Sequence, residues 1–148
     1  MIGSRSLTAQ SMPCEEETFN CAAQVLVIDQ PHGPADVLTR TISRLLDREL
    51  IVASVSDHTE ALCVLSVCDV SLVMAGAQDR RLDGLAILPR IRSLYPQVPV
   101  IVVCADPSAL DVRRAERYGA EEVVGLPQRA ADLRRLTAYL TERYVLAG

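Results

Sequence analysis

Asp29 and Cys104 are the residues of this sequence best placed to do chemistry, because each ends a strongly apolar run. Asp29 ends "QVLVID" and Cys104 ends "VPVIVVC". A carboxylate at such a position can help to bind Mg²⁺, and a thiol can act as a nucleophile or redox sensor where positive charge lowers its pKa. The residue after Asp29 is the neutral Gln30, and no basic residue adjoins Cys104 in the sequence. We therefore interpret Asp29 as a cap for loop amides and Cys104 as a packed, inert thiol.

A third apolar run, "DVSLVMAG", ends at Met74, Ala75 and Gly76, whose side chains can neither ionise nor bind a metal. Asp79 follows in a polar loop beside two arginines, and we interpret it as a solvated loop acid. No nucleophile and base, and no pair of carboxylates, come together at the ends of the apolar runs. The sequence therefore predicts no enzyme, no metal site and no cofactor.

Composition narrows the possible partners and the compartment. The chain has 148 residues, 49% of them hydrophobic, and a net charge of −4, with arginine as its only basic residue apart from two histidines. This acidic balance argues against direct binding of nucleic acid. The five cysteines show no C-x-x-C spacing, and we interpret them as reduced thiols. No apolar run reaches the ~18 residues that a membrane span needs, so we expect a cytoplasmic protein.

The order of the apolar segments predicts an α/β domain. Residues 1–22 lack a sustained apolar period and are predicted to be a flexible N-terminal extension to a domain over residues 23–148. Five segments have the apolar, β-branched character of buried strands, and helical spacing follows each of them. The predicted fold is a doubly wound, flavodoxin-like domain with a parallel sheet of order 2-1-3-4-5. The predicted strands are residues 24–29, 49–55, 70–74 and 100–104, with a short fifth strand inside residues 121–127.

Apolar residues at helical spacing predict the faces that the helices bury. In the first helix the predicted inner stripe holds Leu38, Ile42, Leu45 and Leu46, and in the third it runs from Leu85 to Leu94. In the last helix the predicted inner stripe is Leu133, Leu136, Leu140 and Tyr144. Pro89 must kink the third helix or lie close to its first turn. Gly119 is predicted to end the fourth helix, from about Ser108 to Tyr118, and Ser56 or Asp57 to cap the second.

Several motifs in this order resemble the receiver domain of bacterial response regulators, the CheY-like family. They are "VLVID", "DVSLV" with "LDGL", "PVIVVCA" and "RRAERYGAEEVVGLP", and the resemblance covers about residues 24–144. The family pattern around the third strand resembles D-L-V-L-L-D-x-x-L-P-x-x-D-G-L, in which the sixth residue accepts a phosphoryl group. The resemblance implies a site with Mg²⁺, an acidic pair, a hydroxyl on strand four and a lysine before a proline on strand five.

Most of these groups are missing at the matching positions, which predicts a degenerate phosphorylation pocket. The acidic pair becomes Asp29 and Gln30, and the acceptor becomes Met74, or Ala75 or Gly76 if the loop shifts the register. The hydroxyl position becomes Cys104 and the family's aromatic switch residue becomes Val123. The lysine before proline becomes Leu126, and the resemblance implies a cis peptide between Leu126 and Pro127.

This pattern predicts a pseudo-receiver of two-component signal transduction that works through phosphorylation-independent contact with a protein partner. The predicted interaction face joins helix 4, strand 5 and helix 5, where it also offers a surface for a homodimer. The alternative is a flavodoxin-like domain that binds a small ligand in the emptied crevice, with Met74, Cys104 and Leu126 as an apolar floor. The residues assigned to the interaction face are Arg113, Arg114, Arg117, Val123, Arg134 and Arg135.

Overall fold

The sheet has the predicted order and direction. The structure, a computed structural model, describes residues 23–46, 50–77, 85–108 and 112–145. Its five parallel strands lie in the order β2-β1-β3-β4-β5. Because the order reverses between β1 and β3, the carboxyl ends of these two strands flank the switch point of the fold. The strands are β1 (Val25–Ile28), β2 (Val52–Val55), β3 (Leu72–Ala77), β4 (Val100–Cys104) and β5 (Glu122–Gly125).

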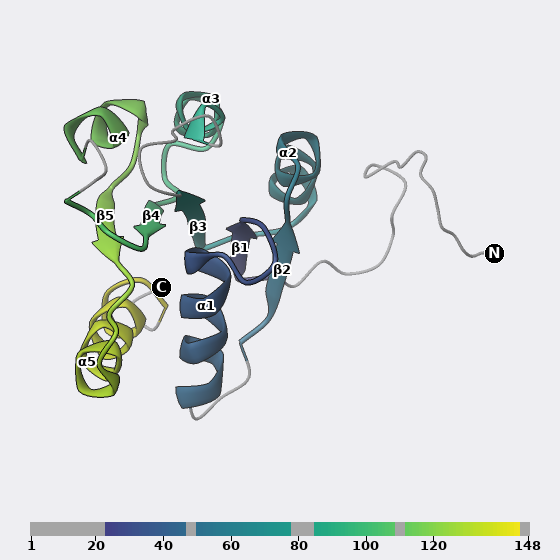
Figure 1. Cartoon of the computed structure of the whole chain (residues 1–148). Coiled ribbons are helices and arrows are strands. Elements are labelled where there is room, and N and C mark those ends of the chain that lie inside the picture. Colours follow the sequence, from purple (N-terminus) through teal and green to yellow (C-terminus); the bar gives the residue numbers. More distant parts are fainter. Residues whose placement is uncertain (1–22, 47–49, 78–84, 109–111, 146–148) are drawn as a thin grey trace.

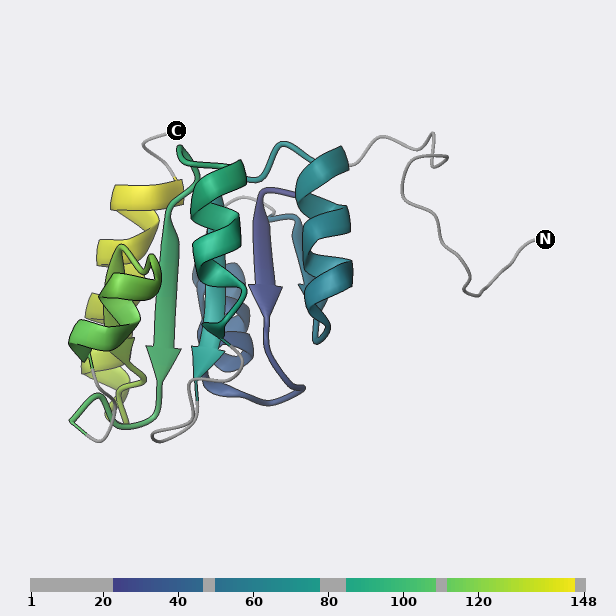
Figure 2. The ribbon, with the colours of Figure 1, turned by 90° about the horizontal axis from the view of Figure 1, so that it is seen from above.

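Helices cover both faces of the sheet (Figures 1 and 2). One face carries α1 and α5, and the other carries α2, α3 and α4. After α5 the chain continues in one wider turn of π-helix, Thr141–Val145. The helices are α1 (Pro34–Leu45), α2 (His58–Val67), α3 (Leu88–Leu94), α4 (Val112–Tyr118) and α5 (Ala130–Leu140).

Each face of the sheet has its own hydrophobic core. Leu38 and Ile42 of α1 pack with Met74, Leu140 and Tyr144 on one side. Leu65, Leu88, Ile91 and Ala115 belong to the core on the other side, where α2, α3 and α4 lie. The central strands β1, β3 and β4 between them are buried almost throughout, which explains why they are continuously apolar in the sequence, whereas the outer strands β2 and β5 are partly exposed.

Local signals set the ends of the helices largely as predicted. The Asp57 side chain accepts a hydrogen bond from the Thr59 amide at 2.7 Å and caps α2. Pro89 lies in the first turn of α3, where its missing N–H costs no helical hydrogen bond. Gly119, with a φ of 121°, follows α4, and a Cβ there would also strike the Arg92 side chain. Ser108, at the predicted start of this helix, lies in a turn, the described part of α4 spans Val112–Tyr118, and residues 109–111 lie outside the described residues.

Two leucines predicted to be buried are exposed instead. Leu45 is 48% exposed and Leu94 is 54% exposed. Each is the last residue of its helix, and the next residue takes the inward position. Leu46 packs against the core beside α1, and Tyr95 packs against the core beside α3. Helical spacing predicts burial only inside a helix, and each helix ends at the leucine in question, so the prediction does not hold at these two positions.

The predictions for the N-terminus and the cysteines have different outcomes. The predicted extension, residues 1–22, lies outside the described residues, as does Asp79. Cys63 and Cys68 are disulfide-bonded, so the interpretation of the cysteines as reduced thiols is wrong for these two residues. Disulfides depend on proximity in space rather than on motif spacing. Cys104 is free and buried.

Candidate functional site

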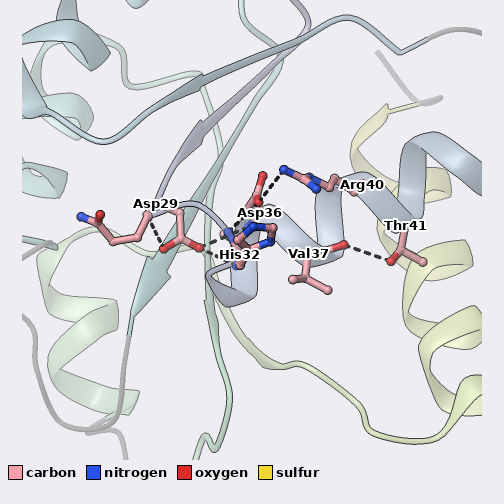
Figure 3. A network of polar contacts seen from close by, with 8 residues as sticks. Asp29, His32, Asp36, Val37, Arg40 and Thr41 are labelled. Atoms are coloured by element: carbon pink, nitrogen blue, oxygen red, sulfur yellow. Dashed lines mark hydrogen bonds and ion pairs between the residues drawn. The ribbon is translucent and has the colours of Figure 1, made fainter.

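The Asp29 carboxylate sits at the switch point and caps α1 (Figure 3). Its Oδ1 accepts a hydrogen bond from the Gln30 amide at 2.7 Å. Its Oδ2 accepts from the amides of Ala35 at 2.8 Å and Asp36 at 3.2 Å, both in the first turn of α1. A carboxylate at a helix N-terminus satisfies amides that have no partner inside the helix and complements the helix dipole. This confirms the interpretation of Asp29 as a cap for loop amides.

Two glycines make room for this carboxylate. A Cβ added to Gly33, which precedes α1, or to Gly76, near the end of β3, would lie well under 3.0 Å from the Asp29 carboxyl group. The register of the sheet explains the second contact, because Ile28 pairs with Ala75 and the next step along both strands brings Asp29 level with Gly76. We call Asp29, Gly33, Gly76 and the three donating amides the carboxylate socket.

Asp36 extends the polar network from the socket along α1 (Figure 3). Its Oδ2 accepts a hydrogen bond from the His32 amide at 2.9 Å and lies 3.3 Å from Nη2 of Arg40. His32 has a φ of 67°, in the left-handed region that non-glycine residues seldom adopt. The buried Asp36 therefore holds the turn between β1 and α1 in a defined conformation.

Met74 and Cys104 lie inside the protein. Met74 is fully buried in the core beside α1 and α5, between Val27 and Ile101 on the neighbouring strands. Cys104 is fully buried, and its Sγ donates to the Val124 carbonyl oxygen at 3.6 Å. Burial raises the pKa of the Cys104 thiol, and the negative charge of Asp106 raises it further. The thiolate is therefore disfavoured, in agreement with an inert cysteine.

The chemistry of the described residues is limited. Within residues 23–46, 50–77, 85–108 and 112–145, no three His, Cys, Asp or Glu side chains gather where they could hold a metal ion. Across the same ranges, the helices are too short or too polar to span a membrane. The feature that organises this end of the sheet is the carboxylate socket.

A comparison with protein families identifies the fold. The model of the response regulator receiver domain matches residues 25–138. The chain belongs to the receiver domain family. Receiver domains are typically signalling domains rather than catalysts.

Relatives and solved structures agree with this family. Regulator of RpoS from Escherichia coli strain K12 is 29% identical over 117 residues, which are 76% of this chain and 32% of that protein. The chain thus spans about a third of the length of the curated relatives it matches. HP1043, an orphan response regulator of H. pylori, has a TM-score of 0.60 at 19% identity, over 84% of this chain and 98% of its own.

Two further structures share the fold. The phosphorylated cyanobacterial phytochrome response regulator RcpA has a TM-score of 0.64 at 14% identity, covering 86% of this chain and 96% of its own. An atypical orphan response regulator, described as having a phosphorylation-independent regulatory mechanism, has a TM-score of 0.57 at 17% identity, over 81% and 93% of the two chains. These similarities establish a receiver, or CheY-like, fold.

The strand-five end of this receiver differs from the expectation in one respect. The peptide between Leu126 and Pro127 is trans, so the predicted cis bond is wrong. A trans peptide is the intrinsically favoured form before proline, and a cis bond needs tertiary contacts that impose it. Here the Leu126 amide donates to the Cys104 carbonyl oxygen at 2.8 Å, and Pro107 packs so closely on Gly125 that a Cβ there would lie under 3.0 Å from the proline ring.

The predicted interaction face lies along α4, β5 and α5, at the edge of the sheet (Figure 1). Val123 is partly buried and packs against the core beside α4. Arg135 forms an ion pair with Asp132 at 3.4 Å in which both side chains are largely exposed. The arginines assigned to this face from the sequence are all exposed: Arg113, Arg114, Arg117, Arg134 and Arg135.

A polar cluster near this face was not predicted from the sequence. The Glu122 carboxylate on β5 accepts hydrogen bonds from the hydroxyls of Tyr139, at 2.8 Å, and Tyr144. Arg143 lies 3.3 Å from the same carboxylate oxygen. Burial, together with the hydrogen bond to Glu122, raises the pKa of Tyr144 to about 12. The cluster fastens the end of α5 and the π-helical turn to β5, and only the inward position of Tyr144 in the helical period hinted at it.

Proposed function

We propose that this receiver domain is a pseudo-receiver that signals by contact with a protein partner and accepts no phosphoryl group. The observation that carries the proposal is the close approach of Gly76 to the Asp29 carboxyl group. Counted back from Gly84 through the family pattern, without any insertion, the acceptor position falls on Gly76 rather than on Met74. The sheet register supports this assignment, because Gly76 is the residue of β3 level with the acid at the end of β1.

The occupied socket is a second reason. Both oxygens of Asp29 already accept hydrogen bonds from backbone amides. Mg²⁺ keeps most of its waters and needs more than one carboxylate or phosphate to bind. With Gln30 in the second acidic position and Gly76 in the acceptor position, Asp29 would be a lone carboxylate ligand, and its Oδ2 is already held by two amides of α1.

The switch positions support the same reading. Cys104 stands where the family has a hydroxyl, and its thiol is turned to the Val124 carbonyl. Leu126 replaces the lysine, and Val123 replaces the aromatic switch residue. None of these groups can bind phosphoryl oxygens as a lysine and a hydroxyl do. The face of α4, β5 and α5 is then fixed in one state, in which it can still recognise a partner.

The exposed arginines suit a partner that presents carboxylates. Arginine binds carboxylates through two parallel hydrogen bonds, and its planar group keeps its charge at all physiological pH values. The arginines of α4 and α5 are exposed. The similarity to Regulator of RpoS and to an atypical orphan response regulator with a phosphorylation-independent mechanism supports a regulatory role. We infer a regulator that binds another protein or a second copy of itself.

Phosphorylation is tested by incubating the protein with acetyl phosphate and Mg²⁺, followed by intact mass spectrometry. We expect no added phosphoryl mass, and beryllofluoride with Mg²⁺ should leave the amide NMR spectrum unchanged. A receiver with a complete aspartate site, treated in parallel, is the positive control. A hydroxylamine-labile phosphoryl adduct on any aspartate of this chain would refute the proposal.

The interaction face is tested by charge reversal. Arg117→Glu with Arg135→Glu should weaken homodimerisation in sedimentation velocity, or binding to an identified partner. Its thermal stability should stay nearly unchanged, because exposed ion pairs contribute about 1 kcal/mol or less. Arg44→Glu with Arg90→Glu, which changes the net charge equally on other surfaces, is the matched control. Equal behaviour of the two variants in both assays would remove this face from the proposal.

A further inference from the structure

A groove of about 440 Å³ runs between α1 and the edge strand β2. β2 is an edge strand of the sheet, and α1 covers β1 and β3 beside it, as Figure 1 shows. The face of β2 on the side of α1 is therefore left open, and Val52 and Ser54 line the groove there. The groove is rich in hydroxyl groups and arginines. Its polar lining includes Thr39, Arg40, Ser43 and Arg44 from α1, with Ser54 and Ser56 from β2 and the turn after it.

The charges that line the groove leave one arginine uncompensated. Asp29 turns both oxygens to backbone amides, and Asp36 pairs with Arg40 at 3.3 Å (Figure 3). Arg44 lies one helical turn beyond Arg40 and makes no ion pair within the part of the chain that the structure describes. An anion in the groove would therefore meet a guanidinium group that no carboxylate of the described residues engages.

Thr39 adds an unsatisfied hydroxyl to the same wall. The residue is 3% exposed, and its Oγ1 is buried without a hydrogen-bond partner. A buried hydroxyl in that state costs about 1–3 kcal/mol, so an apolar residue of the same shape would fit better if packing were its only role. A helical threonine has two accessible χ1 rotamers. A rotation about χ1 can therefore offer the hydroxyl to the groove without moving the backbone.

We propose that this groove binds a small anion that also carries hydroxyl groups. Arg44 binds the acid group, a phosphate or a carboxylate, and the hydroxyls of Thr39, Ser43 and Ser54 bind the polyol part. The volume lies within the range of small-molecule sites. The groove reaches Asp29 and Gln30 at one end, but neither Met74 nor Cys104 lines it, and the proposal does not depend on the proposed pseudo-receiver function.

The test uses ribose 5-phosphate as the phosphate probe and gluconate as the carboxylate probe, titrated at constant ionic strength and followed by amide NMR. We expect at least one of these anions to shift amides of α1 and β2 saturably, and the one that binds identifies the acid group. Ribose, which lacks the charge, should bind at least about tenfold more weakly, a factor that corresponds to ~1.4 kcal/mol. Absence of saturable shifts on α1 and β2 with both anions at millimolar concentration would overturn the proposal.

Three variants separate a built site from general charge attraction. Arg44→Gln should weaken binding by about tenfold or more. Arg90→Gln removes an exposed arginine from α3, on the opposite face of the sheet, and should leave binding unchanged. Thr39→Val should weaken binding several-fold while its thermal stability stays equal or rises. Equal loss in the two arginine variants, or unchanged binding in Thr39→Val, would contradict the proposed roles.

Discussion

Gly76→Ala should destabilise the protein because its new Cβ occupies the space of the Asp29 carboxylate. The added carbon would lie well under 3.0 Å from three atoms of that group, whereas carbon contacts are optimal near 3.5–4.0 Å. The backbone of β3 is held by hydrogen bonds to β1 and β4 on its two sides, so the Asp29 side chain has to move out of the socket. It then loses three hydrogen bonds to amides, at 2.7, 2.8 and 3.2 Å.

The expected cost is on the order of 2–4 kcal/mol. Loss of a helix cap costs about 0.5–2 kcal/mol and overpacking adds about 1–3 kcal/mol, while water recovers part of the lost hydrogen bonding of Asp29, which is partly exposed. In an Asp29→Ala background, the carboxyl group that the new Cβ would strike is absent. Gly76→Ala should then cost nothing, or stabilise by about 0.5–1 kcal/mol because alanine loses less backbone entropy than glycine. The two substitutions should therefore be coupled by about 2–3 kcal/mol.

The assay is equilibrium unfolding in urea, followed by far-UV circular dichroism because the chain has no tryptophan. The wild type, both single variants and the double variant form a double-mutant cycle. Asp57→Ala, which removes the one-amide cap of α2, is the matched control and should be additive with Gly76→Ala. If Gly76→Ala and Asp29→Ala are also additive within about 0.5 kcal/mol, the socket does not couple them and our reasoning fails.

Three further predictions concern buried side chains. The folded pKa of Tyr144, about 12, exceeds the ordinary value near 10, so its contribution to stability is complete below pH 10 and is lost as the pH rises through 12. Between these pH values the free energy of unfolding of the wild type, measured by urea titration, should fall on the order of 2 kcal/mol more than that of Tyr144→Phe. Equal falls in the two proteins would contradict this role of Tyr144. Met74→Asp should destabilise by more than about 4 kcal/mol through an unpaired buried charge, and intact mass spectrometry with acetyl phosphate should show no adduct; a stable, phosphorylated variant would refute this. Cys104 should react with iodoacetamide far more slowly in the native protein than in urea, as measured on its tryptic peptide, and equal rates would show that the thiol is accessible.

The order of the sheet could be predicted from the sequence because it depends on patterns that are local. Each buried strand is a short apolar run, and connections between parallel strands are right-handed, which leaves few topologies. β4 was predicted with its observed bounds, Val100–Cys104. β3 instead runs to Ala77, three residues past the prediction, because the low strand propensity of "AGA" concealed a ladder with β4 that continues to Cys104.

The carboxylate socket could be predicted only in part. Asp29 after an apolar run indicated a cap, since strand-end acids commonly bind loop amides. The contact of Gly76 with that acid depends on the register between β1 and β3, which is set by the packing of both cores and leaves no mark near either residue. The same holds for Glu122 and Tyr144, which are 22 positions apart in the sequence and become neighbours when α5 folds back on β5.

The socket also explains why restoring one residue should not restore a phosphorylation site. A carboxylate returned to position 76 would need the volume that the Asp29 carboxylate fills, and removing Asp29 from the socket would uncap α1. Under the proposed function Asp29 both caps α1 and stands where the family has its acidic pair, so a change that recruits Asp29 to a metal also removes the cap of α1. Recovery of the site would require a second acid at position 30, so that one carboxylate could hold the metal while the other kept the helix. In a chain with Gly76 and Gln30, substitutions on the exposed faces of α4 and α5, or along the groove between α1 and β2, should lower the free energy of unfolding less than substitutions in the socket do.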